Sequence, residues 1–117
     1  MEILVTNNPL VKTKYDNDFM IEFVETDLPG VLIHARDLIH KGHKLLTHPL
    51  SGSVKPNENY YKTVMISGKA NETDFQSAQV IGDCIITTNK FPPRQFPEQY
   101  LYDMQVVDLS LIDSAVK

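Results

Sequence analysis

Short apolar runs, separated by polar segments that contain proline, glycine or asparagine, predict alternating strands and helices along the chain. The run ILV at residues 3–5 is typical of a strand that is buried on both faces. Pro9 follows two asparagines and predicts a short helix over residues 9–15, with one of the asparagines as its N-cap. The apolar run FMIEFV at residues 19–24 predicts a second strand.

The middle of the chain carries a clearer helical pattern. Apolar residues recur at three- and four-residue spacing across residues 30–41 and predict a helix there. Gly42 stands where a helix C-terminus favours glycine, and Lys41 suits the negative end of the helix dipole. The segment KLLT at residues 44–47 predicts a third short strand, and KTVMIS at residues 62–67 predicts a fourth.

The C-terminal third begins with a second helical stripe and ends ambiguously. Thr73, with Gln76 three residues later, forms a capping-box pattern, and the apolar stripe that follows predicts a helix to about residue 89. Beyond the prolines that end this helix, alternating apolar residues favour a strand over residues 100–106, with Asp108 as the cap of a last helix.

This order of elements indicates one α/β domain over residues 1–117. We expect a Rossmann-like, three-layer arrangement around a small, largely parallel sheet. The strands at 3–5 and 44–47 are expected to lie side by side and to point the same way. The loops that follow them would then share one edge of the sheet, which is where ligands bind in such folds.

Composition is that of an ordinary globular chain. Of the 117 residues, 42% are apolar and 22% are charged, and the formal net charge of −4 argues against nucleic acid as a partner. We expect neither a signal peptide nor a membrane-spanning segment, because the apolar runs are too short. The single cysteine, Cys84, excludes an internal disulfide and favours a cytoplasmic location.

The charges are unevenly distributed along the chain. Residues 36–69 carry six lysines or arginines and two acids, whereas residues 71–117 carry seven acids and three bases. A positive middle suits a small anion or an acidic partner protein. A solvated surface of mixed charge explains the same pattern without any ligand.

Three histidines within nine residues, His40, His43 and His48, raise the question of a metal site. Zinc needs three or four ligands that converge within about 2 Å of one point. In the predicted fold, a five-residue strand with about 3.3 Å per residue separates His43 from His48 by roughly 16 Å. We therefore expect no metal site and no bound cofactor, and we interpret these histidines as helix-end or surface residues.

The loops after the strands at 3–5 and 44–47 contain the groups that hold small anions. Hydroxyls, backbone N–H groups near a glycine and a lysine ammonium bind phosphate or carboxylate. Turn-rich connections contain the same residues, and the phosphate-loop spacing GxxxxGK[ST] is absent. The candidate ligand-binding residues are Thr6, Asn7, Asn8, Thr47, His48, Ser51, Gly52, Ser53 and Lys55.

The sequence contains no established catalytic constellation. Ser51 or Ser53 with His48 would form a nucleophile and base, yet the GxSxG elbow is absent. Cys84 lies beside the apolar stripe of a predicted helix and is interpreted as a buried, unreactive thiol. The tyrosines at positions 60, 61, 100 and 102 are expected to be half-buried packing residues or part of a partner surface.

Two stretches resemble a known family. ILVTNNP at residues 3–9 and, above all, RDLIHKGHKLLTHPLSGSVKPNE at residues 36–58 resemble the GrdX family, and the resemblance extends over the whole chain. These small proteins are encoded in the glycine-reductase operons of amino-acid-fermenting anaerobic bacteria. The resemblance implies a cytoplasmic accessory role around a selenoprotein reductase, with glycine-reductase subunits as partners. It assigns no reaction, cofactor or catalytic residue to positions of this chain.

These observations leave three hypotheses. The first is an accessory or regulatory protein of a glycine or amino-acid reductase system that binds a small anionic ligand or a partner subunit. The alternative is a small enzyme acting on a phosphorylated or carboxylated metabolite, with His48 as acid/base and Lys55 or the loop serines holding the anion. The third is a homodimer in which the acidic C-terminal segment packs across the partner.

Overall fold

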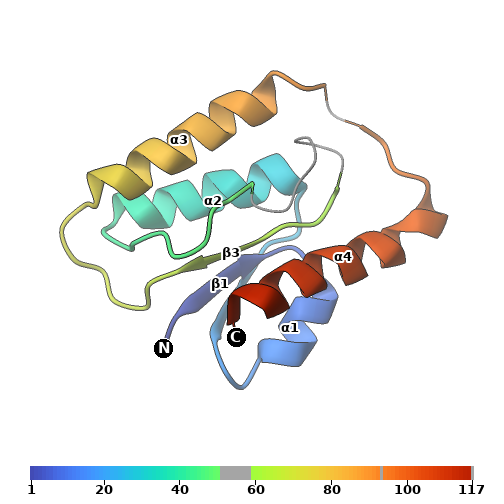
Figure 1. Ribbon diagram of the computed structural model, residues 1–117, viewed down its shortest axis with the longest axis horizontal. Coiled ribbons are helices and arrows are strands. Elements are labelled where there is room, and N and C mark those ends of the chain that lie inside the picture. The colour runs from blue at the N-terminus through green and yellow to red at the C-terminus, as the bar shows by residue number, and fades with distance from the viewer. Residues whose placement is uncertain (51–58, 93, 117) are drawn as a thin grey trace.

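A computed structural model describes residues 1–50, 59–92 and 94–116. Figure 1 shows helices on both sides of a small central sheet, with α2 and α3 together on one side and α1 and α4 on the other. In chain order the elements are β1 (Ile3–Thr6), α1 (Pro9–Tyr15), β2 (Met20–Phe23), α2 (Leu28–His40), β3 (Thr63–Ile66), α3 (Phe75–Asn89) and α4 (Glu98–Val116).

The sheet is small and mixed. Its strand order is β2-β1-β3, with β1 parallel to β2 and antiparallel to β3. β1 is buried along its whole length, as the apolar run ILV predicts. The chain is therefore an α/β protein. Because β3 is antiparallel, the sheet is not largely parallel, and the expected Rossmann-like, three-layer fold is not confirmed.

β1 and β3 each contribute to two apolar clusters, because successive side chains of a strand point to opposite faces of the sheet. The cluster against α2 and α3 includes the buried residues Val5, Leu32, Val64 and Ile81. The smaller cluster lies on the side of α1 and α4 and contains Leu4, Val11, Tyr15, Met65 and Ile112.

Side-chain caps explain where two of the helices begin. Leu10 N donates to Asn8 Oδ1 at 3.0 Å, so Asn8 is the cap of α1, one of the two alternatives that the sequence offers. The cap of α3 is Asp74 rather than Thr73, because the Asp74 carboxylate accepts from the backbone N–H and the hydroxyl of Ser77.

Gly42 ends the α2 region in a conformation that favours glycine. Its φ of 110° lies in the left-handed region, as the helix-end pattern predicts. A Cβ at this position would lie 1.8 Å from Asn71 O, and Asn71 N donates to Gly42 O at 3.0 Å. The turn after α2 is therefore fastened closely to the segment before α3.

The segment 44–47 is not a strand, contrary to the prediction. Only Leu45 forms an isolated antiparallel bridge, to Ile66 of β3. Around this bridge, Leu46 N donates to Met65 O at 2.9 Å and Ser67 N donates to Lys44 O at 2.8 Å. Two further N–H groups bond to side chains, because Lys44 N donates to Ser67 Oγ and Leu45 N donates to Ser77 Oγ. The segment runs in the same direction as β1, as expected, but β3 lies between the two, so the expectation that they are adjacent is wrong.

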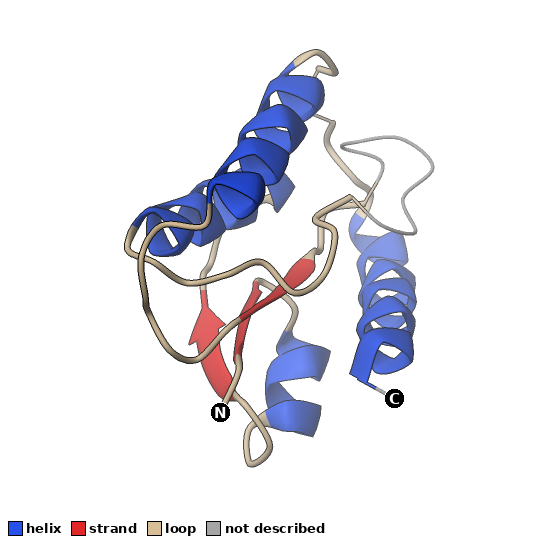
Figure 2. Cartoon of the chain, turned by 60° about the vertical axis from the view of Figure 1, so that its left-hand side comes forward, coloured by secondary structure: helices blue, strands red, loops and turns tan. Residues whose placement is uncertain are grey.

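The C-terminal segment is one continuous helix, α4, and the predicted strand over residues 100–106 is wrong. Asp108 is not a cap but a buried residue in the middle of the helix, and Ile112, four positions later, is buried beside it. Figure 2 shows α4 standing beside the sheet, away from the α2–α3 pair. The apolar residues at the start of this segment alternate as they do in a strand, so the sequence did not indicate that the helix begins there.

Candidate functional site

Three of the predicted ligand-binding residues, 6–8, follow each other at the end of β1 and are buried. The side chain of Asn7 makes three hydrogen bonds within the protein. Its Nδ2 donates to Thr26 O at 2.8 Å and to Tyr60 O at 2.9 Å, and its Oδ1 accepts from Lys62 N at 2.9 Å. Asn7 therefore ties the end of β1 to the segments that lead into α2 and β3.

A chain of hydrogen bonds runs from β1 through β3 to α4. Asn8 N donates to Thr6 Oγ1 at 3.0 Å, and the hydroxyl oxygens of Thr6 and Thr63 lie 2.7 Å apart. Thr63 Oγ1 donates to Asp108 Oδ2 at 2.8 Å. Because a hydroxyl has only one proton, Thr6 is the donor in the bond between the two threonines. All these bonds thus converge on the Asp108 carboxylate.

Asp108 is the principal anchor of α4. Its Oδ1 accepts from Thr63 N at 3.1 Å, and its Oδ2 also accepts from Asn8 Nδ2 at 3.0 Å. The residue is 2% exposed. Burial raises the pKa of its carboxyl, while the bonds from Asn8 and Thr63 and the charge of Lys62 act in the opposite direction. The folded chain therefore favours the protonated form of Asp108 more than water does.

A cleft of about 290 Å³ opens between α4 and the segments at the entrance of β3. It brings two of the predicted residues, Thr47 and His48, together with Lys62, Thr63 and Asp108. The other described residues that line it come from α4 and are Leu111, Ile112, Ser114 and Ala115. This cleft is the candidate ligand site of the protein.

Lys62 is a buried lysine that also lines this cleft. The residue is 4% exposed. Burial lowers the pKa of Lys62, whereas the nearby Asp108 and Cys84 act to raise it. Burial thus disfavours the charged form of both Asp108 and Lys62. The charge of each residue in turn favours the charged form of the other.

His48 lines the same cleft from an exposed position. Its Nδ1 accepts from Leu50 N at 3.2 Å, which places the proton of the neutral ring on Nε2. Thr47 and His48 also line a neighbouring cleft of about 250 Å³, together with Lys44, Asp74 and Ser77. Because the Asp74 carboxylate already occupies the N-terminus of α3, this second cleft is less suited to an anion.

The nine predicted ligand-binding residues thus fall into three groups. Residues 47 and 48 line the cleft, and residues 6–8 lie behind its walls and hold β3 and α4 in place. Ser51, Gly52, Ser53 and Lys55 lie outside the described residues. The role of all nine as ligand contacts stays a prediction.

Sequence reasoning missed the two most deeply buried charged residues of the cleft. Lys62 stands at the start of the apolar run KTVMIS, where a lysine is a common surface residue, and nothing in that pattern distinguishes a buried one. Asp108 was interpreted as a helix cap. Its spacing of four from Ile112 was the available signal that it shares the buried side of a helix.

The three histidines do not converge. His40 is exposed at the end of α2, and His43 Nδ1 donates to Ser67 O at 2.8 Å, beyond the end of β3 that is opposite to His48. Within residues 1–50, 59–92 and 94–116, no three histidine, cysteine, aspartate or glutamate side chains gather at one point. Cys84 is buried, as its position in the helical stripe predicts, and burial raises the pKa of its thiol.

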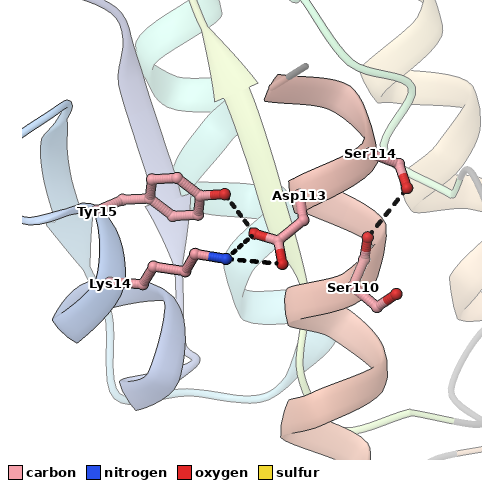
Figure 3. A network of polar contacts seen from close by, with 5 residues as sticks. All are labelled: Lys14, Tyr15, Ser110, Asp113 and Ser114. Atoms are coloured by element: carbon pink, nitrogen blue, oxygen red, sulfur yellow. Dashed lines mark hydrogen bonds and ion pairs between the residues drawn. The ribbon is translucent and has the colours of Figure 1, made fainter.

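A second polar contact fixes the C-terminal part of α4 to α1 (Figure 3). Lys14 Nζ donates to both carboxylate oxygens of Asp113 at 3.0 Å, and the Tyr15 hydroxyl donates to Asp113 Oδ1. Burial, followed by the bond to Asp113, raises the pKa of Tyr15 to about 12, so this phenol remains a donor at neutral pH. Asp108 and Asp113 therefore hold the helix that forms one wall of the cleft.

The raised pKa of Asp108 gives the first testable prediction. In the pH window above about 4, the unfolded chain loses the Asp108 proton before the folded chain does, so this residue makes stability fall as pH rises. Asp108→Asn removes that titration. The difference in unfolding free energy between wild type and Asp108→Asn should therefore shrink as pH rises through the window, measured by urea denaturation at a series of pH values. A difference independent of pH contradicts it, and Asp103→Asn, an exposed acid of α4, is the control.

The fold and the cleft together define a small α/β protein in which a buried acid and a buried lysine line a cleft of about 290 Å³. A family model described as GrdX-like protein matches residues 3–117. The chain therefore belongs to the GrdX-like family, which confirms the resemblance seen in the sequence. No curated protein and no solved structure matches the chain. None of the described helices is both long and apolar enough to cross a membrane.

Proposed function

We propose that this protein is a cytoplasmic accessory protein of a glycine or amino-acid reductase system and that it binds a small anion in the cleft beside α4. Membership of the GrdX-like family supports the first part. The second part rests on Lys62, which is 4% exposed and lines a cleft of about 290 Å³ together with His48. A lysine ammonium forms strong, charge-assisted hydrogen bonds with anions.

Asp108 supplies negative charge to Lys62, but its oxygens are directed toward β1 and β3. Together they accept three bonds, from Asn8 and from the backbone and hydroxyl of Thr63. Burial favours the protonated form of this carboxyl. When Asp108 is protonated, a bound anion replaces its charge beside Lys62. Binding of a monoanion should therefore be accompanied by proton uptake and should strengthen as pH falls.

Two neutral donors complete the proposed site. Thr47 Oγ1 accepts from Met65 N at 3.0 Å, so its own proton is directed to another acceptor. His48 presents Nε2–H when the ring is neutral. An ammonium, a hydroxyl and an imidazole N–H suit a phosphate, an acyl phosphate or a carboxylate, and a cleft of about 290 Å³ has room for a small ligand of this kind.

The first experiment compares anion binding by wild type and Lys62→Met. Inorganic phosphate, acetyl phosphate and acetate are titrated by isothermal calorimetry. Loss of one charge-assisted hydrogen bond, about 1.5–3 kcal/mol, should weaken binding of the preferred anion roughly ten- to hundredfold. Methionine is apolar and similar in length, but removing one member of a buried pair is destabilising, so circular dichroism first verifies that the variant is folded.

Lys69→Met is the matched control. It removes the same charge at an exposed position beyond the opposite end of β3, so it should leave anion binding unchanged. Equal affinity of wild type and Lys62→Met for all three anions, or no binding by wild type, contradicts the proposed site.

The second experiment tests the accessory role. The protein is captured from cells that express the reductase, with and without acetyl phosphate, and the retained proteins are identified. Enrichment of reductase subunits supports the proposal, whereas their absence under both conditions contradicts it. Lys62→Met in the same experiment shows whether capture depends on the cleft.

The position of His48 favours one alternative function, a small enzyme acting on a phosphorylated or carboxylated metabolite. His48 lines the cleft with Lys62 and carries its neutral-ring proton on Nε2, where an acid/base would need it. His48→Ala separates the two functions. It should abolish hydrolysis of acetyl phosphate if the protein is such an enzyme, and it should leave capture of the reductase intact if the protein is an accessory.

A further inference from the structure

A larger cleft lies where the segment before α4 meets the segment before β3. Its volume is about 560 Å³, within the range of roughly 300–1000 Å³ that is typical of small-molecule sites. The described residues that line it are Tyr60, Tyr61, Arg94, Gln95, Phe96 and Leu101. None of them is among the described residues that line the cleft of Lys62, so the two sites are separate.

The lining combines aromatic rings with a guanidinium group. The rings of Tyr60 and Tyr61 meet edge to face, with centroids 5.1 Å apart and an interplanar angle of 78°. Arg94 Cζ lies 5.9 Å from the centroid of the Phe96 ring. The cleft therefore offers ring surfaces for stacking and, beside them, a positive charge that persists at every physiological pH.

The tyrosine side of the cleft is held in place by hydrogen bonds. Tyr61 is 8% exposed, and its hydroxyl accepts from Gln105 Nε2 at 2.9 Å. Tyr61 N donates to Asn59 Oδ1 at 2.8 Å, and Tyr60 O accepts from Asn7 Nδ2 at 2.9 Å. Side chains that are fixed before binding lose less conformational entropy on binding. The same bonds occupy main-chain groups that a peptide would need in order to add here as a strand.

We propose that this cleft binds a small ligand that has a planar aromatic or heteroaromatic ring and one carboxylate or phosphate group. The ring stacks among Tyr60, Tyr61 and Phe96, and the Arg94 guanidinium bonds the anionic group. Extended nucleic acid is disfavoured, because the chain has a net charge of −4. This proposal is independent of the anion site at Lys62, since it uses other residues.

The test titrates two ring-bearing anions, AMP and nicotinate, by calorimetry or ligand-observed NMR. Adenosine and ribose 5-phosphate serve as probes that have only the ring or only the phosphate. AMP should bind more tightly than either part, and comparison with nicotinate distinguishes a phosphate ligand from a carboxylate ligand. Phe96→Leu removes the ring and keeps an apolar side chain, so binding of the preferred anion should weaken about tenfold, the scale of losing one stacked ring. Arg94→Gln should weaken binding by a similar factor.

Two control variants lie on the surface outside this cleft. Tyr102→Leu removes an exposed ring of α4, and Lys90→Gln removes an exposed charge after α3, so both should bind as wild type does. Lys62→Met should also bind AMP and nicotinate normally, which separates this site from the proposed anion site. Circular dichroism of each variant confirms that the fold is retained.

Three results overturn the proposal. The first is absence of binding by wild type at millimolar AMP and nicotinate. The second is equal binding of ribose 5-phosphate and AMP, which would show a site for charge alone. The third is that neither ring-bearing anion binds, whereas a proline-rich peptide binds to wild type and not to Phe96→Leu. That result would identify the cleft as a peptide groove.

Discussion

Replacing Asp108 with alanine is expected to lower the free energy of unfolding by about 3 kcal/mol. The substitution removes the acceptor of three buried hydrogen bonds, from Asn8 Nδ2, Thr63 N and Thr63 Oγ1. It also removes the carboxylate that accompanies the buried amine of Lys62. Urea denaturation followed by circular dichroism measures the effect.

Asp103→Ala is the control for this experiment, because Asp103 is an exposed acid of the same helix and alanine has a higher helix propensity. Its unfolding free energy should stay within about 0.5 kcal/mol of wild type. If Asp108→Ala is no more destabilising than Asp103→Ala, then the hydrogen-bond chain does not anchor α4. The Asp108→Ala, Lys62→Met double variant should recover part of the lost stability, since it no longer buries the amine without the carboxylate.

Replacing Gly42 with alanine is expected to destabilise the protein by more than about 2 kcal/mol. The φ of 110° is strained for any residue with a Cβ, and that Cβ would lie 1.8 Å from the backbone oxygen of Asn71. The turn after α2 and the segment before α3 would have to separate, which breaks the bond from Asn71 N to Gly42 O. Thermal and urea denaturation measure the loss.

Gly82→Ala is the matched control, because it makes the same chemical change inside α3. A Cβ there meets no atom within 4 Å, and alanine is the better helix former by about 1 kcal/mol. The two substitutions should therefore change stability in opposite directions. Destabilisation of the same size at both positions would contradict the special conformation assigned to Gly42.

Local signals predicted the first half of the fold well. The run ILV is the buried central strand, an asparagine caps the helix that starts at Pro9, and Gly42 adopts the left-handed conformation expected after α2. Each of these features depends on residues that are neighbours in sequence, such as a proline next to its cap. A single sequence contains that information directly.

The sheet could not be predicted in the same way, because pairing depends on residues far apart in the chain. The apolar run KLLT satisfies the pattern of a strand, but side chains from Ser67 and Ser77 take two of its N–H groups. A single bridge at Leu45 and the backbone bonds around it remain, and β3 runs antiparallel to this segment. Nothing in the local pattern specifies that reversal, which makes the sheet mixed.

The candidate site was predicted only in part, for a related reason. Thr47 and His48, which line the cleft, were among the predicted ligand residues because loops after strands are common ligand positions. Lys62 and Asp108, which line it too, were not. A lysine at a strand start and an aspartate in a tail are ordinary surface residues in sequence. They become a buried pair only when α4 packs beside β3. No local sequence pattern predicts that contact.

The bonds that hold α4 also constrain how the protein is made. Asn8 and Asp108 are 100 positions apart, and Lys14 and Asp113 are 99 positions apart, so α4 contacts segments that leave the ribosome long before it. Until then Leu4, Val11 and Met65 lack the cover of Ile112. The nascent chain therefore exposes an apolar face until α4 has been made and packed, and such a face is prone to aggregation.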